Sequence, residues 1–104
     1  MSSEILRFAP EMERMILDGW KSCTTRHRQH GDVGDKFTIS GFPYRITEIY
    51  ETDLSDVSEL FYQAEGFNEP QEFSQYWSRV YKTPYCPNET VFVHFFQAVI
   101  GYDY

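Results

Sequence analysis

Residues 19–28 read Gly-Trp-Lys-Ser-Cys-Thr-Thr-Arg-His-Arg, and the rest of the chain is best understood from this stretch. It lies where a short helical pattern ends, at Gly19, and an extended pattern begins. It holds four cationic or potentially cationic side chains and three hydroxyl groups within ten residues. Polar side chains gathered at such a junction favour a functional site. The alternative is a solvated edge strand, on which Lys and Arg discourage pairing with another sheet.

The composition is typical of one compact domain of 104 residues. Hydrophobic residues make up 41% and aromatic residues 18%, which is too apolar for a disordered chain. No apolar run approaches the roughly 20 residues of a membrane-spanning helix. The first residues, Met-Ser-Ser-Glu-Ile-Leu-Arg, lack a secretory signal pattern. We therefore expect a cytoplasmic protein with no membrane partner.

The charge distribution limits the kind of nucleic-acid partner. The formal net charge is −7, from 16 acidic and 9 basic residues, which disfavours extensive binding to duplexes through their phosphates. Five of the nine basic residues nevertheless fall between positions 21 and 45, namely Lys21, Arg26, Arg28, Lys36 and Arg45. A local positive groove for RNA or a small nucleoside-like ligand is compatible with this pattern.

The cysteines and histidines do not predict a metal centre. Cys23 and Cys86 are far apart and match no metal-binding spacing. His27 and His30 have a loop-like H-x2-H spacing with no helical pattern beneath them, and His94 lies in a distant apolar strand. We expect no metal and no cofactor.

The periodicity of apolar residues predicts an α+β fold, with strands curled into a small barrel or sheet and three short helices. Strand patterns cover residues 5–8, 22–28, 36–40, 44–50 and 90–96, and helical patterns cover residues 10–19, 54–66 and 70–81. The alternation along residues 44–50 slips between Ile46 and Ile49, which predicts a β-bulge. His94, between two Phe residues on the last strand, is interpreted as a buried residue with a hydrogen-bond partner. The helical stripe of residues 73–81 is interpreted as core (Phe73, Tyr76, Trp77, Val80, Tyr81).

The order of these pieces resembles the ASCH family. The matching residues are Gly19, Lys21, Ser22, Thr24, Arg26, the Gly34-Asp35 turn, Ala64-Glu65-Gly66-Phe67, Phe73 and Phe95-Phe96. The resemblance implies a single ASCH domain over residues 1–104, with a PUA-like β-barrel of about five strands and three short helices packed on it. ASCH domains are generally proposed to bind RNA or nucleotides. One bacterial branch is an amidohydrolase that removes the acetyl group from N4-acetylcytidine.

The resemblance also implies roles for individual residues in a cleft over one face of the barrel. Lys21, Thr24 and Glu65 match the catalytic residues of the amidohydrolase branch, and Arg26, with Ser22 and Trp20, would bind substrate or RNA. A Thr hydroxyl is a weak nucleophile that needs a base, and a desolvated lysine can act as one. Glu65 would orient Lys21 or shuttle a proton. Strict strand alternation puts Lys21 with Thr25 and Thr24 with Arg26 on opposite faces, so a shared cleft requires an irregular turn before the strand.

Three functions are compatible with these residues. The first is an ASCH-type module that binds RNA or a modified nucleoside in the cleft. The second is an amidohydrolase that deacylates N4-acetylcytidine or a similar small amide, with Thr24 as nucleophile and Lys21 as base. The third is a non-catalytic protein-interaction domain whose basic strand is only a solvated edge. The first two functions, nucleoside or RNA binding and hydrolysis, require Lys21, Arg26 and Glu65 to line one concavity.

Overall fold

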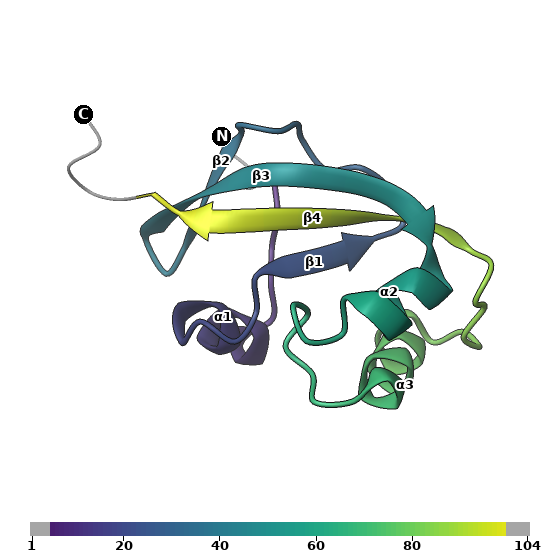
Figure 1. The fold of residues 1–104 in the computed structure, drawn as a ribbon. Coiled ribbons are helices and arrows are strands. Elements are labelled where there is room, and N and C mark those ends of the chain that lie inside the picture. The colour runs from purple at the N-terminus through teal and green to yellow at the C-terminus, as the bar shows by residue number, and fades with distance from the viewer. Residues whose placement is uncertain (1–4, 100–104) are drawn as a thin grey trace.

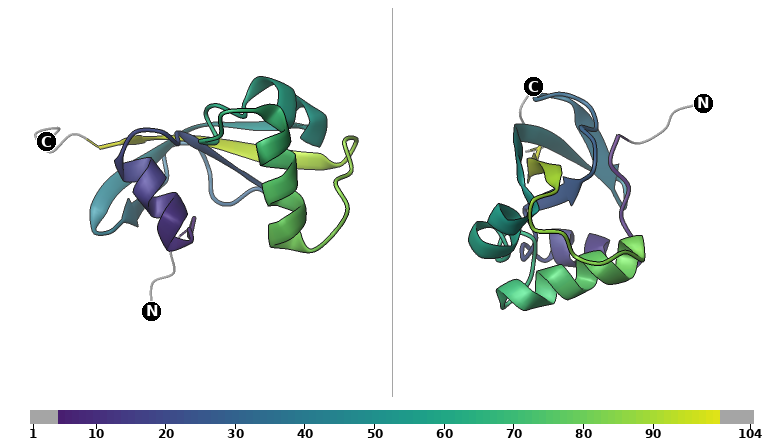
Figure 2. Two further views of the ribbon diagram at one scale, coloured as in Figure 1. Left: turned by 90° about the horizontal axis from the view of Figure 1, so that it is seen from below. Right: turned by 90° about the vertical axis from the view of Figure 1, so that its right-hand side faces the viewer.

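The computed structural model describes residues 5–99, which form an α+β fold built on one curled antiparallel sheet (Figure 1). The elements in chain order are α1 (Pro10–Leu17), β1 (Cys23–Arg26), β2 (Lys36–Ile39), β3 (Phe42–Asp53), α2 (Leu54–Leu60), α3 (Pro70–Tyr81) and β4 (Thr90–Ala98). The strand order is β1-β4-β3-β2. α1 lies toward one end of the strands, and α2 with α3 lies toward the other (Figure 1, Figure 2). Residues 1–4 and 100–104 of the expected domain lie outside the described residues.

The two inner strands explain the curl of the sheet. β4 is apolar on both faces and pairs on both sides, with β1 and with β3. The predicted bulge in β3 is confirmed, because the register with β4 shifts between Ile46 and Glu48. A bulge bends its strand and increases the local twist, so the twelve residues of β3 curve instead of running flat.

Two apolar clusters pack against opposite faces of β4, since Val91 and Val93 belong to one and Phe96 to the other. One lies toward α1 and consists of Leu6, Ile16, Phe37, Ile39, Tyr44, Ile46 and Phe96. The other lies toward α2 and α3 and consists of Cys23, Leu54, Val57, Phe73, Trp77, Val91 and Val93. Each fully buried large apolar side chain contributes roughly 1.5–3 kcal/mol of hydrophobic stabilisation. β1 contributes Cys23 to the second cluster.

The described chain has four strands, and the expected strand over residues 5–8 is absent from it. Leu6 is buried, and Ile5 and Phe8 pack against the first cluster, so the apolar pattern does mark residues that contact the core. Their backbone, however, pairs with no strand of the sheet. The carbonyl of Arg7 instead accepts a hydrogen bond from Nη2 of Arg26 at 2.7 Å. The predicted helix over 54–66 is also shorter, since α2 ends at Leu60 and turns continue to Gly66.

Candidate functional site

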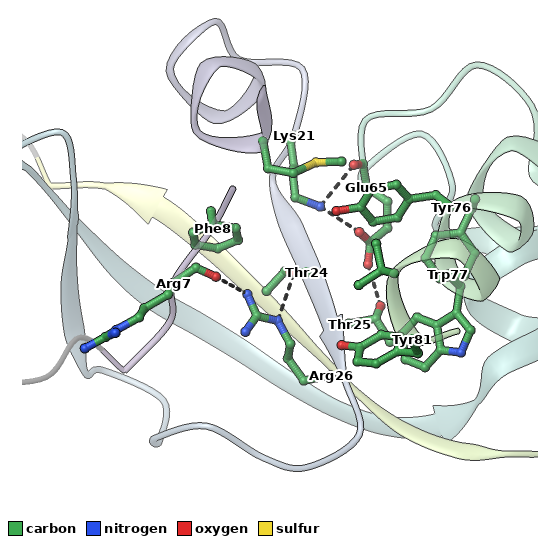
Figure 3. A pocket seen from close by; sticks show the side chains of 13 residues that line it. Arg7, Phe8, Lys21, Thr24, Thr25, Arg26, Glu65, Tyr76, Trp77 and Tyr81 are labelled. Atoms are coloured by element: carbon green, nitrogen blue, oxygen red, sulfur yellow. Dashed lines mark hydrogen bonds and ion pairs between the residues drawn. The ribbon is translucent and has the colours of Figure 1, made fainter. Parts of the chain in front are cut away.

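A cavity of about 200 Å³ lies along the free edge of β1, between α1 and α3 (Figure 3). Its walls come from the segment before α1, from β1, from the corner at Glu65 and from one side of α3. The lining residues are Arg7, Phe8, Met12, Lys21, Thr24, Thr25, Arg26, Glu65, Phe73, Tyr76, Trp77, Val80 and Tyr81. Lys21, Thr24, Arg26 and Glu65, which the sequence singles out, therefore line one concavity.

The polar centre of the cavity is a buried chain of three side chains. Nζ of Lys21 donates to Oε1 of Glu65 at 2.7 Å and to the Glu65 carbonyl at 3.1 Å. The hydroxyl of Thr25 donates to the other carboxylate oxygen, Oε2, at 2.5 Å. Lys21, Thr25 and Glu65 are each 5% exposed or less. Both oxygens of the carboxylate thus accept hydrogen bonds from the protein, and the three side chains are largely shielded from bulk solvent.

The irregular turn before β1 brings Lys21 into this site. Gly19 adopts a φ of 86°, in the left-handed region that favours glycine, and ends α1. The N–H groups of Trp20 and Lys21 both donate to the carbonyl of Met15, at 2.9 and 3.2 Å. The N–H of Ser22 then donates to the carbonyl of Ala64 at 2.7 Å, which fixes the start of the strand beside the Glu65 corner.

Side chains along β1 do alternate between the two faces of the strand. They can still share one cavity, because β1 lies at the edge of the sheet. Lys21 and Thr25 both bond Glu65, whereas Thr24 and Arg26 lie on the other side of the strand, toward Phe8 (Figure 3). Because β1 pairs only with β4, nothing in the sheet covers its other edge. Side chains from both faces can therefore reach the same cavity.

Arg26 is held in place by three contacts. Its Nη2 donates to the Arg7 carbonyl, its Nε donates to Oγ1 of Thr24 at 3.4 Å, and its guanidinium carbon lies 5.2 Å from the centre of the Phe8 ring. Such stacking over an aromatic face is favourable for a planar cation. Desolvation lowers the pKa of Arg26 from its usual high value. At neutral pH the guanidinium remains a cation, so it can donate hydrogen bonds to a ligand.

His94 lies opposite Thr24 of β1 and contacts its backbone. Its interpretation as a buried, hydrogen-bonded residue is confirmed. It is fully buried, its Nε2 accepts from the N–H of His30 at 2.9 Å, and its Nδ1 lies 3.3 Å from the carbonyl of Thr24. Since Nε2 accepts, the proton belongs on Nδ1, which donates to Thr24. Burial lowers the pKa of His94 and favours this neutral form.

The aromatic wall on α3 corrects the interpretation of residues 73–81 as core. Phe73 and Trp77 are buried, but Val80 and Tyr81 are 46% and 36% exposed and Tyr76 is half-buried. The apolar stripe of α3 is therefore wider than the core beneath it, and its more exposed residues, Tyr76, Val80 and Tyr81, line the cavity. Desolvation raises the pKa of Tyr76 and of Tyr81, so both keep their phenolic protons at neutral pH and can donate hydrogen bonds.

Ser22 and Trp20, the other predicted binding residues, do not line this cavity. The side chain of Ser22 is exposed, and its backbone N–H and carbonyl are used by Ala64 and Phe96. Trp20 is 72% exposed and lines a separate, neighbouring cavity. Of the basic residues between positions 21 and 45, only Lys21 and Arg26 line the main cavity.

Within residues 5–99, no three His, Cys, Asp or Glu side chains converge as metal ligands would. Helices long and apolar enough to cross a bilayer are likewise absent from these residues.

Comparison with known proteins identifies the fold. No protein-family model matches the sequence, and no curated protein matches it. Among solved structures, an ASCH domain from Lactobacillus crispatus is 17% identical and superposes with a TM-score of 0.61, over 85% of this chain and 70% of the other. The chain has the fold of an ASCH domain. A protein from Enterococcus faecalis assigned to the family model DUF984 has the same TM-score, 0.61, at 18% identity, over 86% of this chain and 67% of the other.

The expected curled architecture of an ASCH domain is thus confirmed, with four strands within residues 5–99 where about five were expected. Because the identities are only 17% and 18%, the similarity to these two structures establishes the fold and nothing further.

Proposed function

We propose that the cavity beside β1 binds a nucleoside, either free or as one unpaired base of an RNA. The observation that carries this proposal is the ion pair of Lys21 and Glu65, which is buried yet faces an aromatic-walled cavity. A buried ion pair gives up the hydration of both charges, and apolar residues in its place are often neutral for stability or stabilising. Its presence beside a cavity is better explained by a ligand that uses it.

The size and chemistry of the cavity favour a single planar polar ring. About 200 Å³ is below the 300–1,000 Å³ range of pockets for drug-sized ligands. The rings of Tyr76 and Tyr81 suit stacking, and Glu65, Thr24 and Arg26 offer an acceptor, a hydroxyl and a cationic donor near one another. Unstacked bases are recognised in this way, by aromatic rings and by hydrogen bonds to their edges. The net charge of −7 is no obstacle to a neutral nucleoside.

The proposal is tested by calorimetric titration with cytidine, uridine, adenosine, guanosine and N4-acetylcytidine. We expect saturable binding of at least one of them, weakened at least about tenfold in Glu65→Gln, which keeps the shape of the side chain but loses its charge; tenfold corresponds to about 1.4 kcal/mol. Glu59→Gln is the matched control, because Glu59 is an exposed carboxylate on α2. No binding to any of the five nucleosides, or equal loss in both variants, would contradict the proposal.

A second candidate function is hydrolysis of an acylated nucleoside, supported by the shared lining of Lys21, Thr24 and Glu65. Oγ1 of Thr24 would attack the acyl carbonyl carbon, its proton would pass to Lys21, and the amide C–N bond would break as the amine leaves with that proton. Water would then hydrolyse the resulting ester and restore the Thr24 hydroxyl. As an ion pair Lys21 has no free lone pair, so Glu65 must first take up one of its protons.

Incubation with N4-acetylcytidine, followed by chromatography, separates the two candidates. The enzyme would release cytidine and acetate in equal amounts, and Thr24→Val would abolish their release while retaining the affinity for the uncleaved nucleoside. Binding of N4-acetylcytidine with no cytidine formed would leave the binding function alone. Full turnover in Thr24→Val would exclude Thr24 as the nucleophile.

A further inference from the structure

A second cavity, of about 210 Å³, lies next to the proposed nucleoside site and is bordered by an exposed tryptophan. Trp20, Gln63, Gly66, Phe67 and Asn68 line it. Trp20 is 72% exposed, the largest exposed fraction among the large hydrophobic residues that the structure describes. Leaving an indole in water forgoes the stabilisation of burying it, so its exposure beside a hollow calls for an explanation other than packing.

The two cavities share one wall. Lys21 and Glu65 line the first cavity, and their immediate chain neighbours Trp20 and Gly66 line the second. Hydrogen bonds join the two segments, from Nζ of Lys21 to the Glu65 carbonyl and from the Ser22 N–H to the Ala64 carbonyl. Consecutive Cα atoms are about 3.8 Å apart, so the cavities are separated by little more than one residue on each segment.

The lining of the second cavity offers the groups that recognise a base. An exposed tryptophan provides a stacking face for any base. The amides of Gln63 and Asn68 carry both donors and acceptors, the combination that pairs with the edge of adenine. Among residues 5–99, no Asp, Glu, Lys or Arg lines this cavity, which favours a neutral ring over a charged ligand.

We propose that this second cavity is a subsite for the base of a neighbouring nucleotide, so that the protein binds at least two consecutive nucleotides of a single-stranded RNA. The proposal rests on the proposed function of the first cavity. The first base occupies the cavity of Lys21 and Glu65, the phosphodiester crosses the shared wall, and the second base stacks on Trp20. This arrangement gives Trp20 a binding role outside the main cavity.

The protein contains two tryptophans, one at each cavity, so intrinsic fluorescence reports on both. The probes are cytidine, adenosine and the dinucleoside monophosphates CpA and ApC. Trp20→Phe leaves Trp77 as the sole tryptophan, so the tryptophan emission of this variant reports on the first cavity, and the difference between the native protein and this variant reports on Trp20. Trp20→Ala removes the stacking face. Phe42→Ala is the matched control, because Phe42 is 61% exposed and lines neither cavity.

We expect the nucleosides to change the emission of Trp77 alone and CpA or ApC to quench Trp20 as well. The dinucleotide should bind at least about fivefold more tightly than the nucleoside, the factor given by a weak base–aromatic stack. That advantage should vanish in Trp20→Ala and persist in Phe42→Ala. Nucleoside binding with no dinucleotide advantage and no quenching of Trp20 would overturn the subsite and leave the first cavity's function intact. Failure of all four probes to bind would overturn the subsite, and failure of uridine, guanosine and N4-acetylcytidine as well would overturn the first cavity's function.

Discussion

Replacing both members of the ion pair, Lys21→Met with Glu65→Gln, separates what the pair does for stability from what it does for binding. Removing one partner of a buried pair costs about 3–5 kcal/mol, because the other charge remains buried and uncompensated. This range applies here, since the two side chains are 3% and 4% exposed. Gln can keep both hydrogen bonds of Glu65, to Lys21 and to a reoriented Thr25 hydroxyl, so for Glu65→Gln we expect the lower end, about 3 kcal/mol.

A loss of that size is readily measured in a domain whose total stability is about 5–15 kcal/mol. It lowers the Tm by at least about 12 °C, at about 4 °C per kcal/mol for a chain of this length. Lys21→Met alone should cost as much, whereas the double variant should recover to within about 1 kcal/mol of the native protein because no charge is left buried. All three variants should bind nucleosides at least about tenfold more weakly than the native protein.

Urea denaturation followed by circular dichroism measures the three stabilities, and calorimetry measures the affinities. The reasoning would be refuted if the double variant were as unstable as the sum of the single variants. A stable double variant that still bound nucleosides with native affinity would show that the pair serves neither purpose.

Three further predictions concern other side chains. Burial lowers the pKa of His94, so just below pH 6.5 the unfolded chain binds more protons than the native protein, and the free energy of unfolding falls as the pH falls. Urea denaturation at pH 7.5 and 5.5 should therefore show a smaller loss of stability between the two pH values in His94→Gln than in the native protein. Burial and the nearby Glu65 raise the pKa of the Cys23 thiol, so a disulfide reagent at pH 8 should react rapidly with the exposed Cys86 alone and reach Cys23 only in urea. Arg26→Lys should cost about 1–2 kcal/mol in urea denaturation, because an ammonium cannot both stack flat on an aromatic ring and keep the guanidinium's hydrogen bonds; no loss of stability would mean that these contacts contribute little.

The fold was predictable where side-chain pattern and backbone pairing coincide. The sequences of β2, β3 and β4 either alternate between polar and apolar residues or are apolar throughout, and the slip in the alternation of β3 predicts the bulge that its pairing with β4 shows. Residues 5–8 show where this reasoning fails. Leu6 and its apolar neighbours do contact the core, but a pattern of side chains cannot tell a strand from an irregular segment that packs in the same place.

The candidate site was predictable to a similar extent. The resemblance placed Lys21 and Thr24 with the Glu65 corner, but it gave no reason to include Thr25. A signal for Thr25 was present, since alternation puts it on the same face as Lys21, and both bond one carboxylate. The wall formed by Tyr76 and Tyr81 could not be separated from the core by helical spacing alone, because the width of the core beneath α3 is a property of the folded sheet.

The most direct test of the central claim is a crystal structure of the protein with the tightest-binding nucleoside. We predict that the base lies between β1 and α3 against Tyr76 or Tyr81, with a polar edge atom within hydrogen-bond distance of Glu65, Thr24 or Arg26. A nucleoside bound on another surface, with the cavity beside β1 empty, would contradict the claim.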